Sequence, residues 1–160
     1  MKKRTISFEL QVFDTMDELD SGDRELLQLA IEARKDAYAP YSKFNVGAAA
    51  LLRNGVVVIG NNQENASYPS GLCAERVAVF QAGAKYPGVA IKSIAIASMS
   101  QNHVVGSPAA PCGNCRQAIS EYELRQKEPI SILMTGEKGE VIKCSSLSDI
   151  LPLGFSNAYL

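Results

Sequence analysis

The sequence contains little that would place the protein in a membrane, on a nucleic acid or outside the cell. Its 160 residues include no apolar run close to the ~20 residues that cross a bilayer. Sixteen basic residues are balanced by 17 acidic ones, so a small ligand is a better prediction than a polyanion. The basic start, residues 1–5, is followed by alternating polar and apolar residues instead of the apolar stretch of an export signal. We therefore expect a cytoplasmic protein without membrane or nucleic-acid partners.

Internal repeats, low-complexity tracts and linkers are also absent. Hydrophobic residues make up 46% and charged residues 21% of the chain, which is typical of a globular protein. We expect residues 1–160 to form a single domain. Residues 1–20 are interpreted as an N-terminal extension with an additional strand, because apolar and polar residues alternate from Ile6 to Val12.

Strand and helix patterns alternate along the rest of the chain. A helix is expected from about residue 21 to before Pro40, and the dipeptide Asn54-Gly55 predicts a hairpin. The remaining expected helices cover 73–85, 112–124 and 146–151, and the expected strands cover 45–53, 56–62, 89–99, 130–135 and 140–143. This order favours an α/β fold, a three-layer α/β/α sandwich with a mixed five-stranded sheet.

Two short motifs place three of the four cysteines at the starts of predicted helices. Cys73 begins the motif C-A-E, whereas Cys112 and Cys115 belong to the motif P-C-G-N-C. Thiols three residues apart project to the same side of a first helical turn. In a reducing compartment such cysteines are more commonly metal ligands or buried thiols than disulfides, and the positive end of a helix dipole favours the thiolate that binds metal.

Three cysteines can form a structural or a catalytic zinc site. A structural site needs four protein ligands, and Cys144 or His103 would have to supply the fourth. A catalytic site keeps three ligands and one position for water. Glu75 favours this second alternative, because two residues after Cys73 its carboxylate can lie beside the open position and take a proton from water. His103 itself is expected to be solvated, and Cys144 to be a buried or edge thiol.

The sequence resembles the small, homotetrameric cytidine deaminases over residues 38–152. The resemblance is carried by YAPYSKFNVGAA (38–49), GNNQENASYP (60–69), CAER (73–76) and PCGNCRQ (111–117), and LPLGF (151–155) matches the carboxyl end of the family. It implies hydrolytic deamination of cytidine and 2′-deoxycytidine to uridine and 2′-deoxyuridine, with release of ammonia, in pyrimidine salvage. It also implies one Zn²⁺ per subunit on Cys73, Cys112 and Cys115, with Glu75 moving protons between zinc-activated water and the base.

The resemblance further implies how the substrate is held. Asn62 and Glu64, which as alternate residues share one strand face, bind ribose hydroxyls, and Arg76 withdraws charge from the cysteine sulfurs. Without the resemblance, we would interpret Asn62 and Glu64 as a solvent-exposed pair on an edge strand and Arg76 as a solvent-exposed helix residue.

Aromatic residues and one backbone group complete the site that the resemblance implies. Phe44, which would otherwise be assigned to the core, stacks on the pyrimidine, and the backbone of Ala66 hydrogen-bonds the base. Tyr68 lies at a subunit boundary. Phe155 reaches the base from a neighbouring subunit, so a homotetramer is expected.

Two other functions stay open at this point. A related deaminase could act on another amino-heterocycle, such as blasticidin S or a free base, although Asn62 and Glu64 favour a ribosyl substrate. A non-catalytic, zinc-stabilised binding module would hold metal but turn over no cytidine. Deaminases that edit polynucleotides generally carry histidine where this chain has Cys73, which argues against a nucleic-acid substrate.

Overall fold

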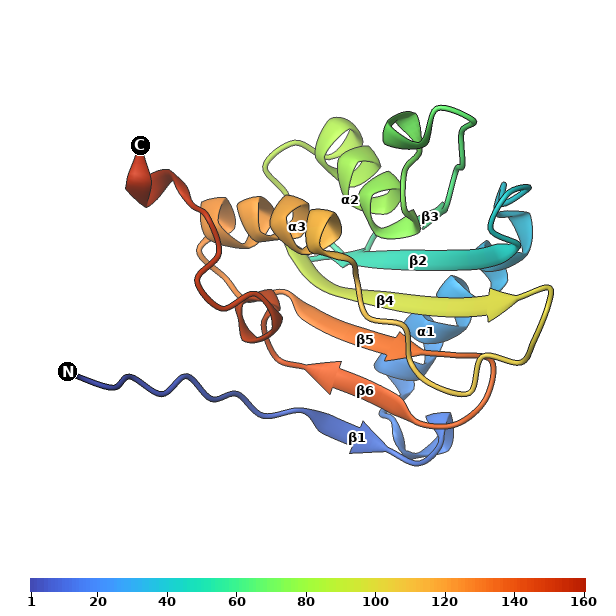
Figure 1. The fold of residues 1–160 in the computed structure, drawn as a ribbon, viewed down its shortest axis with the longest axis horizontal. Helices are drawn as coiled ribbons and strands as arrows, with labels where there is room; N and C mark the ends of the chain where they lie inside the picture. The colour runs from blue at the N-terminus through green and yellow to red at the C-terminus, as the bar shows by residue number, and fades with distance from the viewer.

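The computed structural model describes residues 1–160 and contains one mixed sheet of six strands (Figure 1). The strands are β1 (Gln11–Phe13), β2 (Phe44–Leu52), β3 (Val57–Asn61), β4 (Ile91–Ser100), β5 (Ser131–Thr135) and β6 (Val141–Cys144). Their order across the sheet is β1-β6-β5-β4-β2-β3. β4 and β5 are parallel, and the other neighbouring pairs are antiparallel. The predicted hairpin at Asn54-Gly55 is confirmed as the connection between β2 and β3.

Three α-helices cover the two faces of this sheet. α1 (Ser21–Ala33) packs on one face, and α2 (Ala74–Lys85) and α3 (Gly113–Gln126) lie on the other (Figure 1). Each face has its own apolar core, of nine buried residues under α1 and 18 under α2 and α3. The predicted three-layer α/β/α sandwich is therefore confirmed. No helix combines the length and apolar character required to cross a membrane.

Short 3₁₀ helices occupy several of the connections. They are η1 (Met16–Glu18), η2 (Arg34–Asp36), η3 (Tyr68–Ser70), η4 (Leu147–Ile150) and η5 (Asn157–Tyr159). The last predicted helix, over 146–151, is thus the 3₁₀ turn η4 instead of an α-helix. The first predicted helix ends as an α-helix at Ala33 and continues only as η2.

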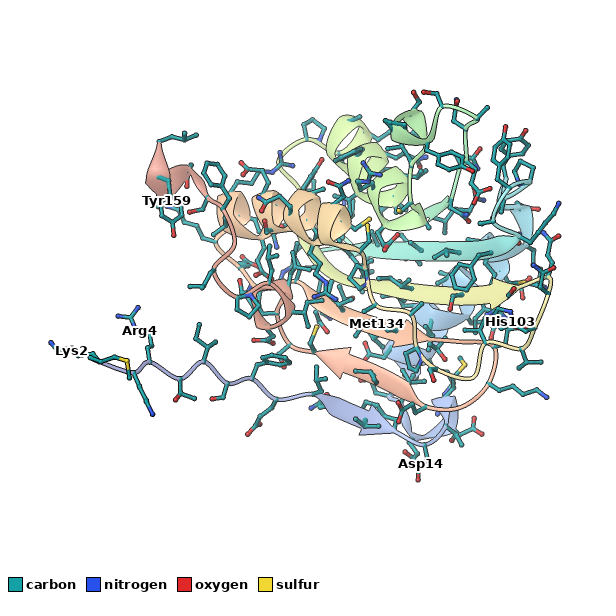
Figure 2. All side chains as sticks on the ribbon, viewed as in Figure 1. Lys2, Arg4, Asp14, His103, Met134 and Tyr159 are labelled. Carbon is teal, nitrogen blue, oxygen red and sulfur yellow. The ribbon has the colours of Figure 1, made fainter.

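The sheet has six strands instead of the five predicted, because the N-terminal extension supplies β1. Val12 of β1 pairs with Ile142 of β6. The bounds predicted for this strand, residues 6–12, were wrong: residues 1–10 are exposed and belong to no strand. The register of β1 on β6 would place residues 6–9 opposite residues 145–148, where the chain has left β6 for η4. Figure 2 shows Lys2 and Arg4 projecting from this extended segment.

A glycine in β3 brings α2 directly onto the sheet. A Cβ atom on Gly60 would lie 2.6 Å from both the Ala74 carbonyl oxygen and the Ala78 amide nitrogen, a distance that packed atoms do not tolerate. Only the absence of a side chain lets the first turn of α2 rest there. Cys73, the N-cap residue of α2, is positioned by this contact.

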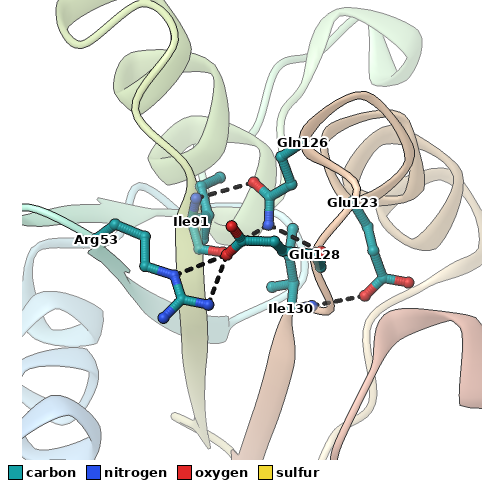
Figure 3. A network of polar contacts seen from close by, with 6 residues as sticks. All are labelled: Arg53, Ile91, Glu123, Gln126, Glu128 and Ile130. Carbon is teal, nitrogen blue, oxygen red and sulfur yellow. Dashed lines mark hydrogen bonds and ion pairs between the residues drawn. The ribbon is translucent and has the colours of Figure 1, made fainter.

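The far end of α3 is attached to β4 by a side-chain amide. Gln126 donates to the Ile91 carbonyl at 2.8 Å and accepts from the Ile91 amide at 3.0 Å (Figure 3). Lys127 then ends the helix in the left-handed conformation, with φ 56°. These contacts hold α3, and with it the first turn that carries Cys115, across the sheet.

Candidate metal centre and substrate pocket

Three cysteines meet where α2 and α3 begin. Cys73 and Cys112 are the N-cap residues of the two helices, and Cys115 lies in the first turn of α3. The Cys112 sulfur is 3.9 Å from that of Cys73 and 3.6 Å from that of Cys115, and all three sulfurs lie within 4.8 Å of one another. A tetrahedral ion with Zn–S bonds of ~2.3 Å holds its sulfur ligands ~3.8 Å apart. The cluster can therefore hold a zinc ion at three corners of a tetrahedron.

Neither remaining soft ligand of the chain belongs to this cluster. Cys144 is buried on β6, 3.9 Å from the Ile132 carbonyl oxygen. His103 is exposed in the loop after β4, and its Nδ1 lies 3.3 Å from the Ser100 hydroxyl (Figure 2). Both residues lie in the surroundings predicted for them. The three-sulfur cluster thus leaves one coordination position open, as in catalytic zinc sites.

Glu75 is buried beside this cluster with an unpaired oxygen. Its exposed fraction is 4%, and Oε2 has no hydrogen-bond partner. Burial, together with the charge of the neighbouring Cys73 sulfur, raises the pKa of Glu75 to about 7. A carboxyl group near this value can both accept and donate a proton at neutral pH.

The Arg76 guanidinium interacts with the sulfur of Cys73. Interactions with the Cys115 and Cys112 thiols and with the Arg76 guanidinium lower the pKa of Cys73 to about 5. Three buried side-chain nitrogen or oxygen atoms in the protein have no hydrogen-bond partner, and two of them, Glu75 Oε2 and Arg76 Nε, are at this cluster. Because such atoms are costly unless something binds them, the donor set and its surroundings fit a metal with a bound ligand.

A cavity of about 390 Å³ opens beside Cys73 and Arg76, within the size range of small-molecule sites. Its other lining residues come from the turn before β2 and the segment between β3 and α2: Tyr41, Ser42, Asn62, Gln63, Glu64, Asn65, Tyr68, Gly71 and Leu72. The structure therefore brings the predicted sugar-binding residues, Asn62 and Glu64, to a cavity that Cys73 of the cysteine cluster also lines.

Glu64 is held in a fixed orientation by the turn before β2. Its Oε2 accepts the backbone amides of Tyr41 at 2.9 Å and Ser42 at 3.2 Å, and its Oε1 accepts the Ser42 hydroxyl. Partial burial opposes ionisation, but the Ser42 hydroxyl and these amides lower the pKa of Glu64 overall. The carboxylate is consequently ionised, and its neighbours fix its orientation.

The Asn62 side chain connects this segment to β2. Its amide donates to the Phe44 carbonyl at 2.9 Å and accepts from the Val46 amide at 2.8 Å. Asn62 is also buried, so it does not belong to a solvated edge. The bonds leave one amide N–H for another acceptor.

Other predicted site residues are not gathered at the cavity within one chain. Phe44 is half-buried at the start of β2, and Ala66 is exposed in the loop before η3; neither lines the cavity. Phe155 is 58% exposed and stacks on Tyr159, with ring centroids 5.7 Å apart. Its segment lies beside α3, away from η3 at the other side of the helix layer (Figure 1).

Tyr41 and Ser42 are cavity residues that the sequence did not single out. The Tyr41 ring lies 6.2 Å from that of Tyr68, centroid to centroid, and Ser42 orients Glu64. Both precede Lys43, whose φ of 58° marks a tight turn. A turn signal could have been found around Pro40, but no local pattern pairs Ser42 with a carboxylate 22 residues away.

Known proteins show the same combination of sequence and fold. A family model for the cytidine and deoxycytidylate deaminase zinc-binding region matches residues 20–128. A cytidine deaminase from Halalkalibacterium halodurans is 46% identical over 135 residues, covering 84% of this chain and 95% of that protein. One from Sporosarcina psychrophila is 36% identical, covering 82% and 90%.

Solved structures of similar proteins agree with the fold. The crystal structure of cytidine deaminase from Burkholderia pseudomallei superposes with a TM-score of 0.70 at 41% identity, covering 82% of this chain and 97% of that one. Cytidine deaminase from Mycobacterium tuberculosis superposes with a TM-score of 0.64 at 33% identity, covering 87% and 99%.

Proposed function

Because the chain belongs to the family of zinc-dependent cytidine deaminases, we propose that it hydrolyses the C4–N bond of cytidine and 2′-deoxycytidine. The products are uridine or 2′-deoxyuridine and ammonia, and the reaction serves pyrimidine salvage. The observation that carries this proposal is the buried Glu75 carboxylate beside the three-sulfur cluster, next to a cavity of nucleoside size. A structural zinc site is closed by four protein ligands and does not require an unpaired carboxylate beside it.

Cys73, Cys112 and Cys115 hold the zinc ion in this proposal. When bound, zinc supplies Lewis acidity that lowers the pKa of water towards ~7. Three thiolates would weaken that acidity, since they outweigh the charge of the ion. The N-termini of α2 and α3 and the Arg76 guanidinium draw charge away from the sulfurs and preserve it.

Glu75 transfers every proton of the reaction. It accepts one from water as the oxygen adds to C4, and it delivers a proton to N3 of the ring. Glu75 then takes the proton of the new C4 hydroxyl group and delivers it to the amino group. C4 becomes a carbonyl carbon, the C4–N bond breaks, and ammonia leaves. The unpaired Oε2 is available for these transfers because no donor of the protein occupies it, and burial keeps bulk water from competing for the proton.

The cavity recognises a nucleoside through Asn62 and Glu64. Glu64, held by Tyr41 and Ser42, accepts a hydrogen bond from a ribose hydroxyl, and Asn62 contributes its free N–H. A negative group fixed near the sugar disfavours a 5′-phosphate, so nucleosides bind better than nucleotides.

Subunit assembly completes the site. In this proposal Phe44 stacks on the base, the Ala66 backbone hydrogen-bonds it, and Tyr68 contacts a neighbouring subunit. Phe155 cannot reach the cavity of its own chain from its place beside α3, so it serves the site of a neighbour in a homotetramer. Each subunit is one domain of residues 1–160, with the N-terminal extension attached through β1.

An ultraviolet assay with four substrates tests the function. Cytidine, deoxycytidine, cytosine and CMP are each incubated with zinc-loaded protein, and zinc per subunit is measured on the same sample. We expect about one zinc per subunit, turnover of both nucleosides, and little or no turnover of cytosine or CMP. Bound zinc without turnover of either nucleoside would contradict the proposal and favour a binding module, and preferential turnover of cytosine would contradict the sugar assignment.

A further inference from the structure

Arg116 holds both carbonyl groups that flank the ligand Cys112. It follows Cys115 in the first turn of α3, where its backbone amide donates to the Cys112 carbonyl at 3.0 Å. Its Nε donates to the Pro111 carbonyl at 2.8 Å. The same residue therefore holds the backbone on each side of the Cys112 side chain, from a helical position next to a second ligand.

The guanidinium also reaches a fixed point elsewhere in the fold. Its Nη1 donates to the carbonyl of Ile150, the last residue of η4, at 2.7 Å. This carbonyl is not on a loose tail, because η4 is attached to α3 by a buried carboxylate. Glu123 accepts the Leu147 amide at 2.8 Å and the Ser148 hydroxyl at 2.6 Å.

The same carboxylate also holds the chain before β5. Glu123 accepts the Ile130 amide at 2.7 Å (Figure 3). Arg116 is thus tied to a part of the structure that α3 itself anchors two turns further along.

Cys112 needs such support more than the other two ligands. It is exposed, whereas Cys115 is buried and Cys73 is half-buried. Its side chain makes no capping hydrogen bond to α3, and the preceding residues 101–111 form neither helix nor strand. Without the Arg116 side chain, the Pro111 carbonyl in the peptide before Cys112 would lose its hydrogen bond, and the helical bond from the Arg116 amide would restrain only the peptide after Cys112.

We propose that Arg116 is a positioning residue of the metal centre: it holds Cys112 at the spacing zinc requires by bridging Pro111 to the η4 segment. This inference rests on the zinc site of the proposed function. The role of Arg116 differs from the role assigned to Arg76, which lies at Cys73 and draws charge away from the sulfurs. Arg116 acts through backbone carbonyls and not through its charge at the metal.

Zinc transfer from the full-length, zinc-loaded protein to a chromophoric chelator tests the proposal. Groups that orient metal ligands typically contribute ~10–100-fold to metal affinity, so Arg116→Ala should weaken zinc binding by that factor and release zinc faster. Arg116→Lys keeps the charge but cannot bond both carbonyls, and should recover only part of the affinity. The matched control is Arg125→Ala, also in α3, where the guanidinium lies over the Tyr122 ring; it should release zinc as the wild type does.

A merely structural role would give a different result. It would lower the unfolding temperature of the metal-free protein while leaving zinc affinity of the folded protein unchanged. Wild-type zinc affinity in folded Arg116→Ala, or in folded Arg116→Lys if the alanine variant does not fold, would overturn the proposal. Since zinc transfer does not require turnover, failure of this inference is distinguishable from failure of the proposed deaminase activity.

Discussion

Gly60 of β3 and Ala78 of α2 are in direct backbone contact. A Cβ atom added to Gly60 would lie 2.6 Å from the Ala78 amide nitrogen and equally close to the Ala74 carbonyl oxygen. Both neighbours are backbone atoms of the helix that begins after Cys73, so neither can rotate away. This contact sets the height of Cys73 and Glu75 above the sheet.

Gly60→Ala should therefore displace the start of α2. Overpacking of a well-packed interior costs ~1–3 kcal/mol, and a shift of Cys73 should also weaken zinc binding and reduce turnover. Urea unfolding and zinc content measure the two effects. Gly22→Ala is the control, because its Cβ would meet only Asp20 Oδ1, at 3.5 Å; it should be neutral or slightly stabilising. Equal behaviour of the two variants would contradict the assignment of Gly60 as the packing contact.

Glu75→Gln should separate metal binding from chemistry. The variant keeps the shape of the side chain and is not a zinc ligand, so zinc content and fold should be preserved. Loss of a general acid–base group reduces the rate by ~10²–10⁴-fold, and use of one group in several transfers should place the loss at or beyond the upper end. Cys115→Ala is the companion variant and should lose zinc as well as activity. Turnover within a few-fold of wild type in Glu75→Gln would place the proton transfers on another group.

Removal of residues 154–160 should affect substrate binding without affecting the metal. The truncation removes Phe155 and its stacking partner Tyr159, but none of the three cysteines. We expect a strong rise in KM for cytidine with unchanged zinc content. Sedimentation of the full-length protein should show a tetramer. A fully active monomer at dilute concentration would remove the reason for assigning Phe155 to a neighbouring site.

Glu123 should make folding stability depend on pH. Burial alone would raise the pKa of Glu123, but hydrogen bonds from Ser148, Ile130, Ser146 and Leu147 lower it below the value of an unfolded glutamate. The folded state therefore binds the proton less readily than the unfolded state. Its contribution is present above the unfolded pKa of ~4.3 and is lost as the pH falls through the folded pKa.

Glu123→Gln provides the measurement. At pH 7 the variant should unfold with ~1–3 kcal/mol less free energy, because it loses hydrogen bonds to a charged acceptor. The difference between the two proteins should shrink as the pH falls below about 4.3. Both proteins are compared in their metal-free form, so acid release of zinc does not contribute to the difference curve. A pH-independent difference would show that Glu123 acts only by packing.

Local chemistry made the cysteine cluster and the helix starts predictable. Thiols three residues apart on a first helical turn share one side whatever surrounds them, so Cys112 and Cys115 could be paired from spacing alone. The hairpin at Asn54-Gly55 was predictable for the same reason, since the turn requires residues that adopt positive φ, as Gly55 does at 84°. The pattern of strands and helices similarly indicated the α/β class.

Strand ends depended on partners that the sequence does not reveal. Alternation from Ile6 to Val12 predicted a strand of seven residues, but only the part of the extension that meets β6 forms one. A strand exists through hydrogen bonds to its neighbour, and the length of β6 limits those bonds. The sixth strand and the position of β1 at the sheet edge follow from that pairing.

What the sequence by itself determined is the chemical identity of the site: three thiolates, one carboxylate and a nearby arginine. What only the tertiary structure decided is their spatial relation. The Cys73 sulfur lies 3.9 Å from the Cys112 sulfur, although the two residues are 39 positions apart in the sequence. The Arg116 guanidinium donates a hydrogen bond to the Ile150 carbonyl, 34 positions away. Such contacts depend on how the helices pack on the sheet, and no periodic pattern in the local sequence encodes that packing. The burial of Glu75 arises in the same way, because it requires the other elements to exclude water.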